Sequence, residues 1–284
     1  MEIIVHDTFT AMADLLRRPL GERRDLLAGM LAPIRAAIPV PGDIVDIHHQ
    51  GAGFRVDRED PRYLPAVEKL IEQDVPGQIE RALGKAAAAL TGLAAPDAIQ
   101  VMFVLGHPDD DYLMNVVGGY YGMGGSGDVI YLLAWPDDDV IGRIAHCAVH
   151  EFHHNIRYRT VEWNPATVTV GEHVVAEGLA EAFVRELSGP EAMGPWSARP
   201  LDDAVFARIV ADLGLQGMQN TPAYVLGDTA MVRFGQEPRG IPDMAGYPAG
   251  LRLVDAHLRA TGRSAVECTG LPAAEILSTW RDEA

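Results

Sequence analysis

The sequence predicts an α+β fold in which three short strands in the middle of the chain are preceded and followed by helices. Two observations carry this prediction. Apolar residues recur at helical spacing through most of residues 10–90 and again beyond residue 140. Between these regions, residues 98–105, 113–117 and 129–133 form short apolar runs that predict strands, the first of them rich in β-branched residues. Separate helical and strand regions are typical of α+β proteins.

The composition indicates a sizeable core and argues against two classes of partner. The 284 residues are 48% hydrophobic and 22% charged, the balance of a soluble globular protein with a sizeable core. This length suits one compact domain with subdomains, or two small domains. Lysine and arginine total 23 against 40 acidic residues, and the net charge of −17 opposes binding to phosphate backbones or anionic lipids. Nucleic acid and membrane partners are therefore not expected.

Targeting and redox features favour the cytoplasm. The first seven residues lack the basic start, apolar run and small-residue cleavage site of a secretory signal. No uncharged apolar run reaches the length of a membrane span. The two cysteines, Cys147 and Cys268, are too few for a disulfide framework. We therefore expect a cytoplasmic protein.

The N-terminal region, residues 1–95, is expected to be mostly helical. Residues 10–38 carry a helical pattern with a break, which predicts two helices. Residues 39–60 are rich in proline, glycine, histidine and aspartate and indicate a loop, with a short strand at 44–47. A helical pattern returns at residues 61–90.

The second expected domain, residues 96–284, contains the strands and a mostly helical C-terminal part. Residues 118–127 are too glycine-dense for a regular element. Acidic residues then favour a helix start before the helical pattern of residues 140–159, and a further helix at 174–187 is stopped by a Ser-Gly-Pro sequence. Three more helices are expected toward the C-terminus, at residues 201–213, 250–260 and 273–280.

A metal-binding motif lies in the helix predicted at 140–159. His150, Glu151 and His154 match the pattern H-E-x-x-H. Residues four apart lie one above the other on a helix, so both histidines can present a ring nitrogen to one Zn²⁺. Glu151 can then reach a water on the metal without being a ligand. This pentapeptide also arises by chance, but the helical flanks favour a zinc site that serves hydrolysis.

A catalytic zinc usually has three protein ligands, and the next helix offers the third. Glu177 follows His154 at a distance that allows the chain to turn back as a second helix. Glu181, one turn later, could accept a hydrogen bond from a ligand histidine. Glutamates four apart are also common on solvated faces, but this stretch is otherwise apolar and unpaired charges there would be costly. Glu177 is the expected ligand, with Glu181 and Glu172 as competitors.

Three sequence stretches resemble a known bacterial family. Residues 148–155 carry the histidine motif, residues 177–181 read Glu-Gly-Leu-Ala-Glu, and residues 246–252 read Gly-Tyr-Pro-Ala-Gly-Leu-Arg before a helix. Together with the glycine-rich approach to the strand at 129–133, they resemble the YjaZ-like family of predicted zinc-dependent proteases, within the broader gluzincin group. The Glu-Gly-Leu-Ala stretch is also similar to the one in which gluzincin aminopeptidases carry their third zinc ligand.

The resemblance implies a thermolysin-like core with a small mixed sheet and an active-site helix beneath its edge strand. It also implies a zinc-dependent peptidase acting on a peptide or protein substrate, in which Glu151 is the general base. A tyrosine lies well after the third ligand in gluzincin aminopeptidases, and Tyr247 is the corresponding candidate for the oxyanion donor. Packing of Tyr247 against its loop is an equal alternative, and Tyr158 and His257 are weaker candidates.

Two further interpretations stay open on the sequence alone. The glycine-rich residues 118–127 could let a peptide pair with the following strand, or could form a flexible hairpin loop. The whole site could instead be a catalytically silent zinc module that binds a protein partner. Glu151 favours catalysis over the silent module, because a structural zinc site does not need it. His146 and Cys147 are expected to support the metal ligands or to lie in the core, and His153 to point away from the metal. His48 and His49 are expected to belong to a loop rather than to a second site.

Overall fold

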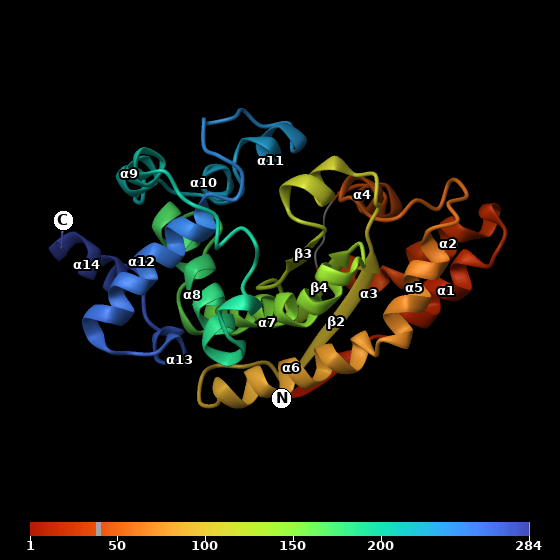
Figure 1. The fold of residues 1–284 in the computed structure, drawn as a ribbon, viewed down its shortest axis with the longest axis horizontal. Helices are drawn as coiled ribbons and strands as arrows, with labels where there is room; N and C mark the ends of the chain where they lie inside the picture. The colour runs from red at the N-terminus through yellow and green to blue at the C-terminus, as the bar shows by residue number, and fades with distance from the viewer. Residues whose placement is uncertain (38–40, 284) are drawn as a thin grey trace. The chain divides into compact units, whose positions relative to one another are not determined.

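A computed structural model describes residues 1–37 and 41–283 of the chain (Figure 1). The chain divides into two compact units, one of residues 1–88 and 95–155 and the other of residues 89–94 and 156–284. Helix α7 (Asp138–Thr160) carries the chain from the first unit into the second. Among the described residues, no helix combines the length and the apolar character needed to cross a membrane.

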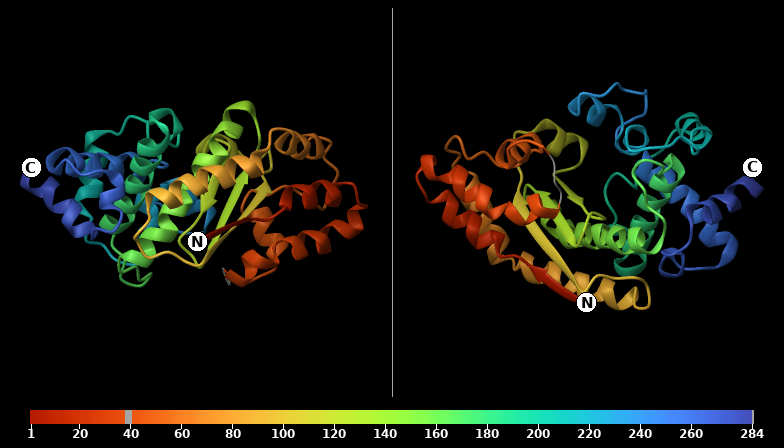
Figure 2. Two further views of the ribbon diagram at one scale, coloured as in Figure 1. Left: turned by 90° about the horizontal axis from the view of Figure 1, so that it is seen from below. Right: turned by 180° about the vertical axis from the view of Figure 1, so that it is seen from behind.

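The first unit contains a mixed sheet of four strands, which lie side by side in Figures 1 and 2. Their order is β1 (Glu2–Val5), β2 (Ala98–Leu105), β4 (Val129–Ala134) and β3 (Tyr120–Met123). Strand β2 is parallel to both β1 and β4, whereas β3 runs antiparallel to β4. The small mixed sheet and the predominance of helices confirm the predicted α+β class.

The predicted strand at residues 129–133 is an interior strand of this sheet. All six residues of β4 are buried, and only β2 among the other strands approaches this degree of burial. A strand covered on both faces needs apolar side chains at every position, which explains the unbroken hydrophobic run. The edge of the sheet next to β4 is formed by β3.

Helices of the first unit pack around the sheet, and α1 shows how they are held. Asp7 caps α1 by accepting a hydrogen bond from the amide of Thr10. The hydroxyl of Thr8 donates to the carbonyl of Phe103 on β2, and Phe9 stacks on Phe103 with ring centroids 4.9 Å apart. The helices that precede β2 are α1 (Thr8–Leu16), α2 (Leu20–Met30), α3 (Ala32–Ala37), α4 (Ile44–Gln50), α5 (Tyr63–Glu72) and α6 (Val75–Ala89).

Several local predictions in this unit were wrong. The strand expected at 44–47 is helix α4, because the carboxylate of Asp43 accepts hydrogen bonds from two backbone amides of its first turn. The strand expected at 113–117 is a turn of π-helix, Tyr112–Val116. Residues 10–38 hold three helices rather than two, and β1 was not foreseen. The ends of these expected segments at residues 38–40 lie outside the described residues.

The second unit is helical among the residues described, and α8 (Val170–Ser188) packs along α12 (Gly246–Thr261) (Figure 1). A Cβ atom at Gly178 would lie 2.6 Å from the amide nitrogen of Leu251, and one at Gly250 would lie 2.8 Å from the carbonyl carbon of Val174. Glycine at both positions therefore lets the backbones of α8 and α12 approach closely. The remaining helices are η2 (Pro190–Ala192), α9 (Asp203–Ala211), α10 (Pro222–Leu226), α11 (Asp228–Arg233), α13 (Ala265–Cys268) and α14 (Ala273–Glu283).

Candidate metal centre

Helix α7 presents the two histidines of the H-E-x-x-H motif side by side. The helix runs over 23 residues and has acidic residues in its first turn, where the helix dipole favours them. His150 and His154 are one turn apart and only 6% and 5% exposed. Their Nε2 atoms lie 3.1 Å from each other. The helix thus directs two imidazole nitrogens to one buried point.

The distance between these nitrogens fits a shared zinc ion. Two ligands at about 2.05 Å from a tetrahedral zinc lie about 3.3 Å apart. The observed 3.1 Å separation of the His150 and His154 Nε2 atoms is close to this value. A hydrogen bond between two neutral imidazoles would give a similar distance. A third ligand beside the two histidines is therefore needed to favour a metal ion over a hydrogen bond.

Glu177 completes a group that could hold a metal ion. One ligand atom from each of His150, His154 and Glu177 lies within 4.8 Å of the others. All three residues are buried. Two imidazoles and one carboxylate are a usual donor set for a catalytic zinc that keeps one position open. The residues present therefore fit a zinc ion.

Helix α8 explains why Glu177 is buried. It begins at Val170, four residues earlier than expected, because Thr169 and Glu172 form a capping box. From Val174 to Val184 every residue of the helix is buried, so the hypothesis of a solvated glutamate face was wrong. Glu177 is 6% exposed on this apolar helix.

The two competing glutamates have other partners. The carboxylate of Glu172 accepts a hydrogen bond of 2.8 Å from the amide of Thr169 in the capping box. The carboxylate of Glu181 accepts one of 2.8 Å from the amide of Gly194. Neither belongs to the three-residue group with His150 and His154. The hydrogen bond expected between Glu181 and a ligand histidine stays a prediction.

His173 is a neighbour of Glu177 that was not singled out from the sequence. Its Nε2 lies 3.7 Å from a carboxylate oxygen of Glu177, one turn along α8. Its Nδ1 lies 3.0 Å from the hydroxyl of Thr221, and its ring meets that of Trp163 edge to face. These contacts fix the ring so that it can orient the Glu177 carboxylate. The four-residue spacing from His173 to Glu177 repeats the spacing of the two histidines and could have drawn attention to it.

Glu151 lies directly against the edge strand β3. It is 8% exposed, and a Cβ atom at Gly122 would come within 2.7 Å of its carboxylate oxygen Oε1. A Cβ atom at Gly124 would come within 2.7 Å of the Asn155 side-chain oxygen. The glycines at these two positions are therefore needed for the close approach of β3 to α7. A side chain at either position would push the strand away from Glu151.

The glycine-rich segment is more ordered than expected. Residues 120–123 form the edge strand β3, although the glycine density of the segment argued against a regular element. Asn155 holds the residues that follow, because its side-chain oxygen accepts from the amide of Gly125 and its amide donates to the carbonyl of Gly127. Asn155 was not singled out from the sequence. The hypothesis of a flexible hairpin loop was therefore wrong for residues 120–123.

The candidates for the oxyanion donor have local packing partners. Tyr247, in the first turn of α12, has its ring centroid 5.4 Å from that of Trp196. Tyr158 stacks on Trp163, and the Nδ1 atom of His257 lies 2.8 Å from the hydroxyl of Thr279. The contact with Trp196 supports the packing interpretation of Tyr247. Its role as a donor stays a prediction.

His48 has a structural role in helix α4. Its Nε2 lies 3.0 Å from the carbonyl oxygen of Phe54. Burial lowers the pKa of His48 to about 3, so the ring is neutral at physiological pH. A neutral, fully buried ring bonded to the backbone suits a packing role.

A second group of possible metal ligands lies in the first unit. One ligand atom from each of Asp60, His107 and Asp109 lies within 4.8 Å of the others. The guanidinium group of Arg62 pairs with both carboxylates at 2.6 Å, and the ring nitrogens of His107 bond to Arg58 and to Tyr63. These partners already satisfy the cluster, so we assign it a structural role.

Comparisons with known proteins bear on this site. A family described as "Predicted Zn-dependent protease (DUF2268)" matches residues 79–278. A relative from Bacillus subtilis (strain 168), "Uncharacterized protein YjfC", is 34% identical over 172 residues, which are 60% of this chain and 58% of the relative. The match thus spans less than two thirds of that relative. No solved structure matches the chain significantly.

Proposed function

The chain belongs to this family of predicted zinc-dependent proteases, and from that premise we propose that it is a zinc peptidase with Glu151 as its general base. The observation that carries the proposal is that Glu177 of α8 groups with His150 and His154, on the same turn of α7 that presents Glu151. A metal that only stabilised the fold would not need a glutamate beside it.

His150, His154 and Glu177 are the proposed zinc ligands. Zinc, when bound there, supplies a Lewis acid that polarises a carbonyl group and lowers the pKa of a water molecule. The two histidines act as neutral ligands, and Glu177 contributes one negative charge. His173 holds the Glu177 carboxylate in place from the preceding turn of α8.

Glu151 moves the proton in the proposed reaction. Its carboxylate takes a proton from the attacking water while the water oxygen bonds to the scissile carbonyl carbon. When the C–N bond breaks, Glu151 gives this proton to the leaving amine. The reaction consumes one water and yields a carboxylate and an amine. The packing of Gly122 against Glu151 limits the positions that the carboxylate can take.

Strand β3 is the proposed binding edge for the substrate. It is the last strand of the sheet and pairs with β4 along one side. An extended peptide could pair with the other side through backbone hydrogen bonds, which require no particular side chains. Because β3 lies against Glu151, a peptide added there would pass close to the general base.

Tyr247 is the proposed donor to the oxyanion, and a thermolysin-like core is the proposed architecture. The place of Tyr247 well after the third ligand, comparable to that of a tyrosine in gluzincin aminopeptidases, supports its role. The contact between Tyr247 and Trp196 would then position the ring rather than replace its function. Substitution of Tyr247 by Phe separates the two interpretations, since it keeps the packing and removes the hydroxyl donor. A lower kcat in this variant with an unchanged melting temperature supports the donor role.

The proposal is tested by measuring zinc content and peptide cleavage together. Wild-type protein and a Glu151→Gln variant are purified, their zinc content is measured by mass spectrometry, and both are incubated with a mixed peptide library. We expect about one zinc per chain in both proteins and cleavage by the wild type alone. Zinc in both without cleavage in either contradicts a peptidase and favours a silent zinc module. Absence of zinc from both contradicts the metal site itself.

A further inference from the structure

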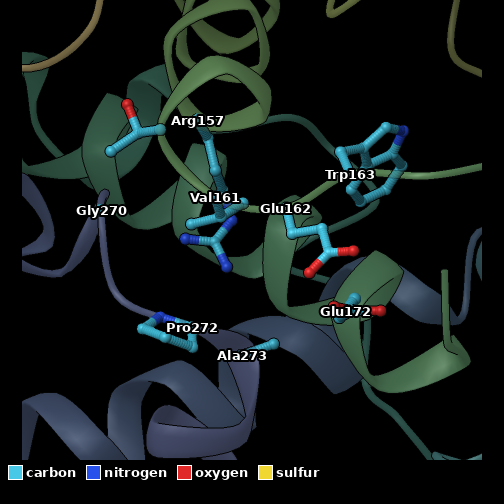
Figure 3. A pocket seen from close by; sticks show the side chains of 9 residues that line it. Arg157, Val161, Glu162, Trp163, Glu172, Gly270, Pro272 and Ala273 are labelled. Carbon is cyan, nitrogen blue, oxygen red and sulfur yellow. The ribbon is translucent and has the colours of Figure 1, made fainter.

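A pocket in the second unit has a buried arginine in its wall (Figure 3). Its volume is about 330 Å³, within the size range of small-molecule sites. Arg157, Glu162, Trp163 and Glu172 supply its charged and aromatic lining, and Pro272 closes another side. Neither the zinc ligands nor Glu151 belong to this lining.

Arg157 is held from one end of its guanidinium group. The side chain is 1% exposed, and its Nη1 atom donates hydrogen bonds to the carbonyl oxygens of Thr269 at 2.8 Å and Leu271 at 3.0 Å. Both N–H groups of Nη1 are therefore used. Neither bond involves Nη2, and Nε has no hydrogen-bond partner among the described residues.

The remaining edge of Arg157 has the geometry that recognises carboxylates. The N–H groups of Nε and Nη2 point in parallel from one side of the planar guanidinium, and this pair of donors matches the two oxygens of a carboxylate. In Figure 3 the guanidinium group ends among the side chains of Val161, Glu162 and Pro272. The Nε and Nη2 edge of Arg157, which makes neither of the two main-chain bonds, is thus directed at the pocket.

The pocket also carries negative charge. Burial lowers the pKa of Arg157 to about 10, opposed in part by the charge of Glu172, so the guanidinium stays protonated at neutral pH. Glu172 and Glu162 line the same pocket. Two carboxylates would repel a dianion such as phosphate, but they would favour a ligand that carries a cation beside its acid group. A buried cation with an unpaired Nε–H group and two nearby carboxylates therefore selects a zwitterion.

We propose that this pocket binds a small zwitterion, of the class of a free α-amino acid. The ligand carboxylate pairs with the Nε and Nη2 edge of Arg157, and its ammonium group is held by Glu162 and Glu172. Trp163 supplies an apolar wall for a side chain, fixed by its stacking on Tyr158 with ring centroids 3.7 Å apart. The site is separate in its residues from the proposed zinc ligands and does not depend on peptidase activity.

The binding is tested by the indole N–H signals of protein labelled at tryptophan with nitrogen-15. The chain has four tryptophans, so the signal of Trp163 can be assigned with a Trp163→Phe variant. The probes are L-alanine, propionate, ethylamine and inorganic phosphate. Propionate lacks the ammonium group of alanine, and ethylamine lacks its carboxylate. We expect alanine to shift the Trp163 signal at millimolar concentration, and propionate and ethylamine to bind about 10-fold more weakly.

Variants assign the binding to the pocket. Arg157→Lys keeps the charge but loses the parallel donors, and it should weaken alanine binding by about 10-fold or more. Arg185→Lys, which alters an arginine paired with Asp255 in the same unit, is the matched control and should not change it. Glu162→Gln, at an exposed position, should reduce the preference for alanine over propionate. The indole signals of the other tryptophans would reveal whether Arg157→Lys folds. If it does not fold, Glu162→Gln still tests the pocket.

Three results would overturn the proposal. The first is a Trp163 signal that alanine does not shift. The second is a shift of equal strength in a folded Arg157→Lys variant, since the arginine edge would then be irrelevant. The third is phosphate binding at a lower concentration than alanine, which would replace a zwitterion with an anion as the ligand class.

Discussion

The close approach of Gly122 to Glu151 allows a sharp test of Glu151 as the proposed general base. A Gly122→Ala variant places a Cβ atom 2.7 Å from Oε1 of Glu151, whereas ordinary van der Waals contacts begin near 3.4 Å. The Cγ atom of Glu151 lies nearer still to that Cβ. The Glu151 side chain or β3 must therefore shift by at least roughly 0.7 Å, and misplacements on the order of 1 Å in active sites cost up to about 100-fold in rate. We expect kcat to fall between about 10-fold and 100-fold.

The zinc content of Gly122→Ala should not change, because the atoms nearest to an added Cβ at Gly122 all belong to Glu151 and none to the proposed zinc ligands. The assay is steady-state cleavage of a peptide that the library screen identifies, with zinc measured on the same samples. Gly142→Ala is the matched control, since Gly142 lies in α7 and an added Cβ meets nothing within 4 Å. The control should keep full activity and gain about 0.5–1 kcal/mol of stability.

A folded Gly122→Ala variant with wild-type kcat would refute this reasoning. It would mean either that Glu151 is not the base or that its position against β3 does not matter. Loss of zinc from the variant would also contradict the proposed roles, because the strand would then support the metal rather than the base.

Three further predictions concern the ligand helix, its packing and a buried histidine. His173→Ala should weaken zinc affinity by about 10-fold to 100-fold in a chelator competition, as expected for a residue that orients a ligand; unchanged affinity contradicts its role. Gly250→Ala should lower the unfolding free energy by about 1–3 kcal/mol because its Cβ meets the α8 backbone, whereas Gly214→Ala, with open space, should not. The folded-state pKa of His48 lies near 3, below the usual 6.5, so the unfolded chain binds the proton more readily than the folded chain. The free energy of unfolding should therefore fall by up to about 4 kcal/mol as the pH drops from 6.5 toward 3. A His48→Gln variant should lose less stability over the same pH range.

Helix α7 could be predicted because its determinants are local. The acidic start, the helical period and the four-residue histidine spacing of α7 all lie within one segment, and α7 indeed spans Asp138–Thr160. The strands β2 and β4 were foreseen for the same reason, since buried strands leave an unbroken apolar run. The local sequence pattern was enough to predict the two strands because nearly all of their residues are buried.

Other elements depend on partners far away in the sequence. Strand β1 has only four residues and exists because it pairs in parallel with β2, nearly a hundred positions later. Strand β3 contains Gly122, which lowers its strand propensity but is required by the proximity of Glu151. The sequence predicts a strand in place of helix α4 because Ile44, Val45 and Ile47 are β-branched, and the cap by Asp43 decides the outcome. Long-range contacts overrode local propensity in the two strands, and a local cap did so in the helix.

The residues of the candidate site likewise divide into those set by a local motif and those that depend on distant partners. His150, Glu151 and His154 follow from one motif, and Glu177 was expected from the next helix. His173 escaped notice because its relevance depends on the position of Glu177 on α8 and on Thr221 beyond it. The Arg157 pocket also escaped notice, since main-chain carbonyls from residues 269 and 271 define it and no sequence pattern shows them.

The position of the bound zinc ion is the most direct test of the proposed centre. The decisive measurement is an anomalous difference map at the zinc absorption edge from crystals of the zinc-loaded protein. We expect one strong peak within about 2.2 Å of Nε2 of His150, Nε2 of His154 and a carboxylate oxygen of Glu177. A peak at Asp60, His107 and Asp109 instead, or no peak near His150 and His154, would contradict the proposed centre.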